Sequence, residues 1–344
     1  MNWRLIAVLL SFLPVILLFI FSPVSVTDIF SVGIAPFLTA VLFSLAKVFL
    51  QAYRFKYFVD KFLGYKISSS LKLISVRIGS EFVTNTTPSY IGGEIVRIAW
   101  LTKNKVPAGI AAWITTMEII ADVFVGTILA LFAGIIALYN GAILIGTIII
   151  LISSFIFGFW LIVVILSAYY NIQLPKVITK LVRRFLSHER SDKIINYTNS
   201  AISDLCTMSR ENFNSRRTIK IFFVGMVLTF FAFACLGASF LVLGGLIESD
   251  LGLYDSILAT AASTELGSLP ITVGGSGLTE IGLWAYVSGL NNLPSLNEVL
   301  KDSHLDVIIS WRIASYHIPL MIMWLVLMRL TVIKKITSKT DQKS

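Results

Sequence analysis

Two short stretches decide the fold: TTPSYIGGEIVR at residues 86–97 and LPITVGGSGLTE at residues 269–280. Both place the pattern Pro-x-x-x-Gly-Gly inside an otherwise apolar segment. Proline removes a helical hydrogen-bond donor and clashes with the preceding turn, whereas paired glycines permit positive φ angles and close backbone approach. Each stretch is therefore expected to end one half-helix and to begin another.

The composition around these stretches is that of a protein built for lipid. Of the 344 residues, 56% are hydrophobic and only 14% are charged, whereas soluble domains carry about 25% charged residues. The longest polar stretch, residues 172–220, is shorter than the roughly 100 residues of an ordinary independent domain. We therefore expect a single transmembrane domain over residues 1–344.

Apolar runs of about 20 residues, the length that spans the hydrocarbon core, predict six spanning helices. They lie at about 4–22, 34–56, 108–138, 142–169, 217–247 and 304–331. No small-residue cleavage site follows the first run, so it is expected to be retained rather than removed as a secretory signal. Interrupted apolar segments at about 70–103 and 253–291 predict two re-entrant broken-helix hairpins. The predicted fold class is an all-α polytopic membrane protein that resembles an inverted repeat.

Basic residues in the connections predict the orientation, because Lys and Arg stay on the cytoplasmic side. Arg54 and Lys56 lie at the end of the second run and Lys61, Lys66 and Lys72 follow it, residues 172–220 are strongly basic, and residues 332–344 form a basic tail. We therefore expect both termini in the cytoplasm of a multi-pass cell-membrane protein, with the two hairpins entering from opposite sides. If residues 175–186 form a helix, one of its faces is apolar and the opposite face is largely basic. This pattern predicts an interfacial helix on the cytoplasmic leaflet.

Ionisable residues inside apolar segments cost roughly 2.5–3.5 kcal/mol each, so they usually face a cavity or a partner. They either form ion pairs that only hold the bundle together, or they bind an anionic headgroup through the guanidinium groups of Arg77, Arg97 and Arg312. The unpaired N–H groups of the half-helices after each glycine pair suit a phosphate or carboxylate as well. The candidate substrate-binding residues are Arg77, Glu81, Pro88, Gly92, Gly93, Glu94, Arg97, Glu118, Asp122, Glu265, Pro270, Gly274, Gly275, Gly277, Glu280, Arg312 and Tyr316.

Other chemistry finds little support in the sequence. The two cysteines, Cys206 and Cys235, predict neither a disulfide nor a metal site. Glu118 and Asp122 lie on one face of one helix and supply too few ligands for a divalent ion. We expect no cofactor and no nucleic acid, and because no catalytic constellation is recognised we expect no enzyme activity.

In order and spacing these motifs resemble the lysylphosphatidylglycerol synthase transmembrane, or flippase-like, family, over residues 70–320. The resemblance rests on Arg77 with the first glycine break, on Glu118 with Asp122, on the second glycine break, and on Arg312 with Tyr316. It implies a membrane domain that handles lipid headgroups, such as those of aminoacylated phospholipids or polyprenyl-linked sugars. Full-length synthases of this family add a soluble aminoacyl-transfer domain, so a chain ending at Ser344 is expected to be a stand-alone flippase-like protein.

Three functions remain open at this point. A lipid transporter or flippase would use the paired breaks and the buried charges to move an anionic headgroup, either of a phospholipid or of a polyprenyl phosphate. An intramembrane transferase would need a nucleophile or an acid–base pair near an activated donor. An accessory subunit would serve a synthase encoded elsewhere. Membrane lipids, with a second copy of the chain or a partner synthase, are the expected partners.

Overall fold

The computed structural model describes residues 32–87, 92–170, 179–180, 183, 188–212, 215–245, 251–269, 271–289, 291 and 304–340. The predicted first span at 4–22, Pro88, Pro270 and the end of the tail lie outside these residues. The predicted interfacial helix at 175–186 also lies outside them, apart from residues 179, 180 and 183.

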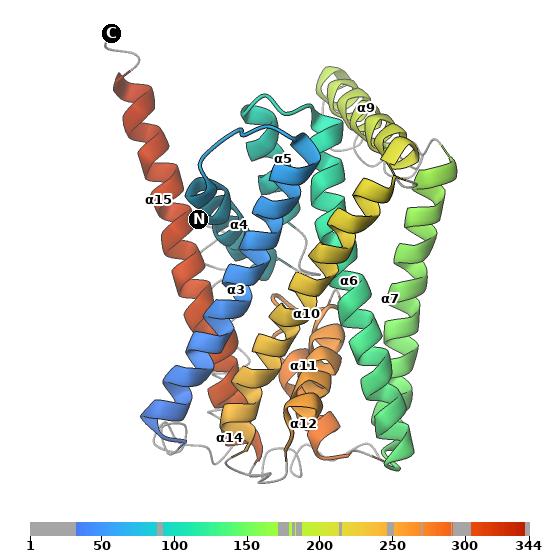
Figure 1. The fold of residues 1–344 in the computed structure, drawn as a ribbon, viewed down its shortest axis with the longest axis vertical. Coiled ribbons are helices and arrows are strands. Elements are labelled where there is room, and N and C mark those ends of the chain that lie inside the picture. Colours follow the sequence, from blue (N-terminus) through green and yellow to red (C-terminus); the bar gives the residue numbers. More distant parts are fainter. Residues whose placement is uncertain are drawn as a thin grey trace.

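The described residues form a bundle of helices (Figure 1). Five helices are long and apolar enough to cross a membrane. Four of them are continuous: α3 (Ile34–Leu63), α6 (Ala108–Tyr139), α7 (Ile143–Tyr169) and α10 (Arg216–Gly244). The fifth consists of α14 (His304–Arg312), a π-helical turn η1 (Ile313–His317) and α15 (Ile318–Thr340). The five predicted spans within the described residues are therefore present, with α3 extending seven residues further than expected.

The two interrupted segments each form a pair of shorter helices. The first pair is α4 (Ser70–Asn85) with α5 (Gly93–Lys103), and the second is α11 (Leu253–Gly267) with α12 (Leu278–Val287). In Figure 1 the first pair occupies the upper half of the bundle and the second pair the lower half. Helix α4 packs against α3 and α15, while α11 packs against α6 and α10. Each pair is therefore enclosed by long helices.

The polar stretch that the sequence suggested to be mainly a loop contains a further helix. Helix α9 (His188–Asn212) crosses one end of the bundle and packs against α6 and α7 (Figure 1). Its low mean hydropathy hid it from a search for apolar runs, although Cys206 and Ser209 on its inner face are buried. A Cβ at Gly109 of α6 would lie 3.2 Å from the backbone carbon of Asp204, so the two helices approach closely there.

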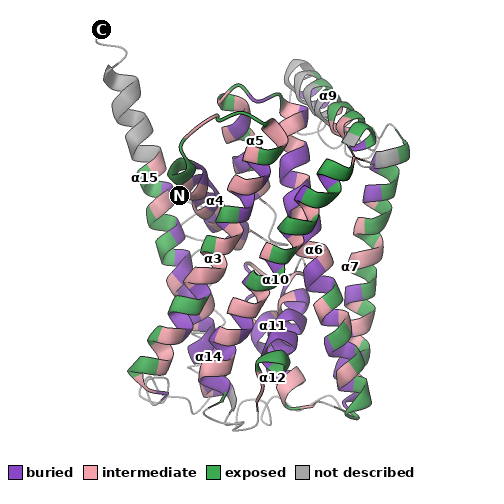
Figure 2. Ribbon diagram, in the orientation of Figure 1, coloured by how far each residue is buried: buried purple, intermediate pink, exposed green. Residues whose placement is uncertain are grey.

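The outer faces of the long helices carry exposed apolar side chains, as Figure 2 shows for α7. Among them are Leu151, Phe155 and Ile162, whose exposed fractions are 64%, 74% and 58%. Large apolar surfaces of this kind are rare on soluble monomers. They are expected where the surrounding medium is hydrocarbon, so the exterior of the bundle confirms a membrane protein.

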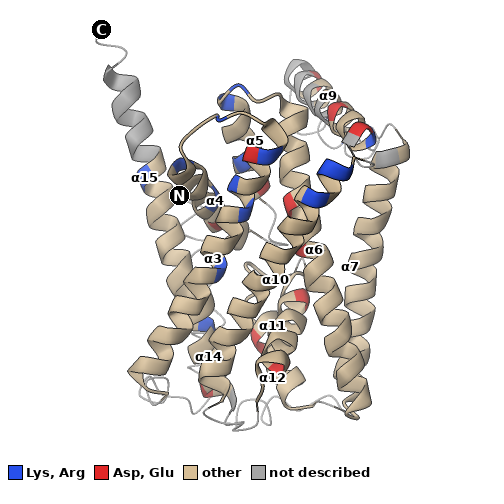
Figure 3. Cartoon of the chain, in the orientation of Figure 1, with Lys and Arg blue, Asp and Glu red and all other residues tan. Residues whose placement is uncertain are grey.

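Inside the bundle, buried apolar side chains form three clusters. The first gathers side chains mainly from one end of α6 and from α10, α11, α12 and α14, the second mainly from α3, α4, α5 and the opposite end of α6, and the third from α4, η1 and α15. On α6, the buried Glu118 lies among members of the second cluster, between Met117 and Ile120. Figure 3 shows acidic residues on α6, α11 and α12 within the bundle.

Helices α6 and α7 form a close antiparallel pair. Replacing a glycine at their contact tests how tightly the two helices pack. A Cβ at Gly146 would lie 2.9 Å from the carbonyl oxygen of Gly134, whereas a Cβ at Gly158 on the same helix meets nothing within 4 Å. We expect Gly146→Ala to lower the free energy of unfolding by about 1–3 kcal/mol. The control Gly158→Ala should be neutral or stabilising by up to about 1 kcal/mol. Thermal unfolding in detergent measures both, and equal effects would contradict the helix contact.

Candidate functional site

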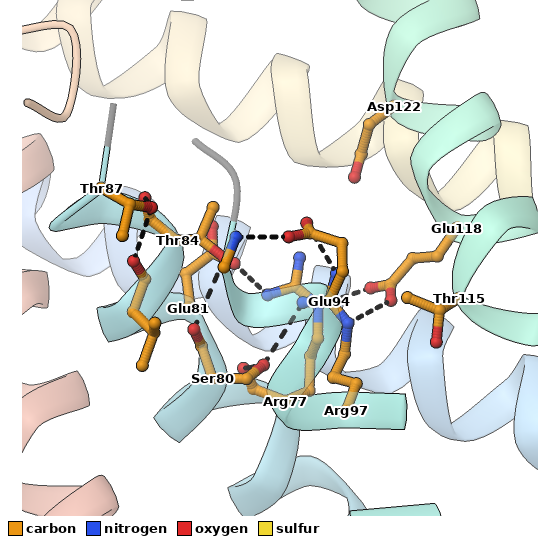
Figure 4. Close-up of polar contacts among 12 residues, drawn as sticks. Arg77, Ser80, Glu81, Thr84, Thr87, Glu94, Arg97, Thr115, Glu118 and Asp122 are labelled. Carbon is orange, nitrogen blue, oxygen red and sulfur yellow. Dashed lines mark hydrogen bonds and ion pairs between the residues drawn. The ribbon is translucent and has the colours of Figure 1, made fainter. Parts of the chain in front are cut away.

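The carboxylate of Glu118 on α6 forms the centre of a buried ion-pair network (Figure 4). Glu118 is 1% exposed and pairs with Arg54 of α3, Arg77 of α4 and Arg97 of α5. The Arg54 Nη2–Glu118 Oε1 distance is 3.3 Å and the Arg97 Nε–Glu118 Oε2 distance is 3.2 Å. One carboxylate therefore ties three other helices to α6.

Arg54 also holds the second acid of α6. Its two terminal nitrogens donate to the two carboxylate oxygens of Asp122 at 2.5 and 2.6 Å, and Nη1 also donates to the hydroxyl of Thr229 on α10. A bidentate arginine–carboxylate pair is the strongest common form of charged hydrogen bond. The side chain of Arg54 is fully buried, so the expectation that Arg54 is one of the cytoplasmic loop charges is wrong. Helix α3 continues to Leu63 and carries Arg54 inside the bundle.

In the first break, a glutamate caps the half-helix that follows. The backbone N–H of Gly92, whose φ is +146°, donates to Glu94 Oε2 at 2.8 Å. The other oxygen of Glu94 accepts from Arg97 Nη2 at 3.1 Å. An acid in the first turn is favourable because the N-terminus of a helix carries partial positive charge. A Cβ at Gly93 would lie 2.7 Å from the carbonyl oxygen of Ser80, so glycine lets α5 start directly against α4.

The second break repeats this arrangement with a more distant arginine. The backbone N–H of Gly277 donates to Glu280 Oε2 at 2.8 Å, and Glu280 Oε1 lies 2.9 Å from Arg312 Nε. Arg312 comes from α14 and also donates through Nη2 to the carbonyl oxygen of Gly274 at 2.6 Å. In both breaks, a glycine N–H and an arginine therefore hold opposite oxygens of one glutamate.

The π-helical turn brings the two breaks together. In a π turn the N–H of Ile318 reaches back to the carbonyl of Ile313, and such turns often occur at functional sites. The Tyr316 ring lies 4.0 Å from the Arg312 guanidinium carbon, and its hydroxyl donates to the carbonyl oxygen of Asn85 at 2.7 Å. A Cβ at Gly274 would lie 2.5 Å from that same Asn85 oxygen. The end of α4 and the second glycine pair are thus in contact.

Lys47 is a basic residue of this region that the candidate list omitted. It lies on α3, seven residues before Arg54, and its charge interacts with those of Glu81 on α4, Asp122 on α6 and Arg312 on α14. Protein surrounds the side chain, yet part of its surface remains accessible. Within the described residues, Lys47 makes no hydrogen bond and no ion pair. The sequence could have indicated Lys47 as a candidate, because it is a charged residue within a long apolar run.

Glu265 on α11 is the one candidate acid that lies apart from both networks. Its side chain is buried, and one carboxyl oxygen would lie 2.8 Å from a Cβ at Gly126 of α6. Among the described residues no cation pairs with it. A carboxyl buried without a cation is less costly in its protonated form.

The structure thus divides the candidate residues between two connected groups. Arg77, Glu81, Gly92, Gly93, Glu94, Arg97, Glu118 and Asp122 belong to the first. Gly274, Gly275, Gly277, Glu280, Arg312 and Tyr316 belong to the second. The (i, i+4) pair Arg77–Glu81 and the (i, i+3) pair Glu94–Arg97 form as the spacing indicates. Arg54, Thr229 and Lys47 are additions that no local spacing revealed.

Neutralising Glu118 should lower the stability much more than neutralising Glu265. Glu118→Gln leaves three buried arginines short of a carboxylate, and breaking a buried ion pair in this way costs about 3–5 kcal/mol. Glu265→Gln removes an acid that has no cationic partner, so we expect a change below about 1 kcal/mol. Thermal unfolding of both purified variants provides the comparison. Equal melting temperatures for Glu118→Gln and the wild-type protein would contradict the proposed network.

Comparison with known proteins agrees with this arrangement. No curated protein and no solved structure shows a significant match to the chain. The family model described as the lysylphosphatidylglycerol synthase TM region matches residues 4–327. This match covers both breaks, the arginine–glutamate networks, four of the long helices and most of the fifth span, and the chain therefore belongs to the lysylphosphatidylglycerol synthase transmembrane-region family.

Proposed function

We propose that this protein is a lipid flippase that moves an anionic headgroup, of a phospholipid or of a polyprenyl-phosphate-linked lipid, past a central site between the two breaks. The observation that carries the proposal is Lys47. A cation inside a membrane bundle is costly without a counter-charge, and Lys47 has no direct acidic partner among the described residues. A phosphate between the breaks would supply that counter-charge.

The arrangement of the broken segments supports transport rather than simple binding. We infer that α4 with α5 forms a re-entrant pair from the cytoplasmic side and that α11 with α12 forms one from the opposite side. Opposed pairs of interrupted helices that meet near the midplane are typical of the binding sites of secondary transporters. Here Gly274 of the second break lies beside the Asn85 carbonyl at the end of α4, and Tyr316 of η1 donates to the same carbonyl. A headgroup at this contact could be reached from either half of the bundle.

The neighbouring acids define how a phosphate would enter. The first group contains four basic side chains, Lys47, Arg54, Arg77 and Arg97, and four acidic ones, Glu81, Glu94, Glu118 and Asp122. Glu118 is 1% exposed, whereas the exposed fractions of Glu81 and Asp122 are 13% and 33%. A phosphate would therefore compete with Glu81 and Asp122, while Glu118 keeps the arginines in place. Arginine suits this exchange because its planar fork binds carboxylate and phosphate alike.

The transport proposal is tested with proteoliposomes that contain a fluorescent phosphatidylglycerol and a reductant added outside to quench the outer leaflet. We expect Lys47→Gln to slow the loss of inner-leaflet fluorescence at least about tenfold, the effect of roughly 1.4 kcal/mol on the headgroup. Its melting temperature should not fall, because an unpaired buried charge is removed. The matched control is Lys56→Gln, since Lys56 lies on the same helix and pairs with Asp60 near the surface.

Two results would count against the proposal in different ways. If wild-type protein exchanges neither phosphatidylglycerol nor a labelled polyprenyl phosphate, transport is wrong, and a role as accessory subunit or transferase gains weight. If wild type exchanges lipid but Lys47→Gln and Arg312→Ala do so equally fast, the flippase class stands and the central site is wrong.

The orientation is tested by cysteine labelling in a background of Cys206→Ser and Cys235→Ser. Tyr65 lies in the connection between α3 and α4, and Asn140 lies in the turn between α6 and α7 at the other end of the bundle; both are exposed. An impermeant maleimide added to intact cells should label Asn140→Cys at once and Tyr65→Cys only after permeabilisation. The reverse pattern would overturn the proposed sidedness.

A further inference from the structure

A second basic site lies away from the central network, where α3 ends and α10 begins. A cavity of about 530 Å³ opens there, and it is lined by Tyr57, Lys61, Arg216, Arg217, Lys220 and Val224, together with Ile221. Figure 3 shows the basic residues at this end of α10. The cavity shares no residue with the ion-pair network of the two breaks.

The charges of this cavity are not balanced by acids among the described residues. Within the described part of the chain, none of its four cations forms an ion pair with an acid. Arg216 and Arg217 also begin α10, and no acid lies in its first turn. Cations at a helix N-terminus oppose the helix dipole. The site therefore concentrates positive potential that an anion would relieve.

One of these cations has a structural role that separates it from the others. Arg217 donates through Nη2 to the carbonyl oxygen of Lys61 at 2.8 Å, close to the left-handed Gly64 that ends α3. An arginine at this position satisfies a carbonyl that the helix leaves free. Arg216 and Lys220 are exposed and make no hydrogen bond with other described side chains. Together with Lys61, which is also exposed and forms no ion pair with a described acid, Arg216 and Lys220 are thus the side chains available to an anion.

Beyond the basic residues, the part of α10 that lines the cavity is apolar. Ile221 and Val224 follow the basic residues along α10, and Val224 is exposed on the face that continues into the apolar exterior of the bundle. Tyr57 adds an aromatic ring at the same level, as is common at membrane–water interfaces. A free phosphate would use the cations alone, whereas a phospholipid would use both the cations and the apolar wall.

We propose that this cavity is a docking site for an anionic phospholipid of the adjoining leaflet, with its phosphate between Arg216 and Lys220 and its acyl chains along Ile221 and Val224. The site binds lipid whether or not the central region transports it. The ligand belongs to the chemical class of phosphatidylglycerol: one phosphate, no compensating amine on the headgroup, and two acyl chains.

The proposal is tested on full-length protein in nanodiscs with a photoactivatable phosphatidylglycerol whose diazirine lies near the start of the acyl chain. We expect cross-links within residues 216–224, and much weaker labelling by the phosphatidylcholine analogue. A basic residue near an anionic surface contributes about fivefold in binding, so Arg216→Gln with Lys220→Gln should reduce labelling roughly twentyfold. The matched control, Lys66→Gln with Lys72→Gln, removes two exposed lysines outside the cavity and should leave labelling unchanged.

Either of two outcomes would overturn the docking site. The first is undiminished labelling of residues 216–224 in the Arg216→Gln, Lys220→Gln protein. The second is displacement of the lipid by soluble glycerol phosphate at equal concentration, which would identify a site for water-soluble phosphates. Because cross-linking requires no movement between leaflets, a failure of lipid exchange in proteoliposomes leaves this test unaffected.

Discussion

The sharing of one buried carboxylate by three arginines is the interaction on which the rest of the structure depends. Glu118 joins α6 to α3, α4 and α5 within the apolar cluster that these helices share. Each of these charges alone would disfavour insertion into a bilayer. Together they form a network in which loss of one member leaves the other buried charges without a partner. The positions of the four helices therefore depend on one another. That dependence fixes the first break in place before any ligand is considered.

In both breaks the same arrangement caps the half-helix that follows, but the arginine in it comes from a different place. Glu94 and Glu280 each accept from a glycine N–H and pair with an arginine. In the first break the arginine lies one turn away, whereas in the second it comes from α14. The glutamates thereby occupy the helix N-termini that the sequence suggested for phosphate. Under the proposed function, an anion would instead bind at Lys47 and at Arg77 and Arg54, whose partners Glu81 and Asp122 are partly exposed.

Much of this could be predicted because a membrane restricts what a sequence can do. Long apolar runs predicted the five long helices, and charged residues within apolar context, such as Arg77 and Glu118, predicted the buried networks. The partners across helices could not be predicted, since Arg54 and Thr229 meet through packing at a separation of 175 residues. Arg54 was misplaced because charge near the end of an apolar run normally marks a loop. Helix α9 was missed because its stability comes from contact with α6 and α7 rather than from apolar periodicity.

The central claim is that an anionic headgroup binds between the two breaks, next to Lys47. The most direct measurement is an experimental structure of the protein in nanodiscs rich in phosphatidylglycerol. The account predicts phosphate density within hydrogen-bonding distance of the Lys47 ammonium, with Glu81 or Asp122 displaced from its arginine. A well-ordered structure in which Lys47 contacts only protein or water, and every lipid lies on the outer faces, would contradict it.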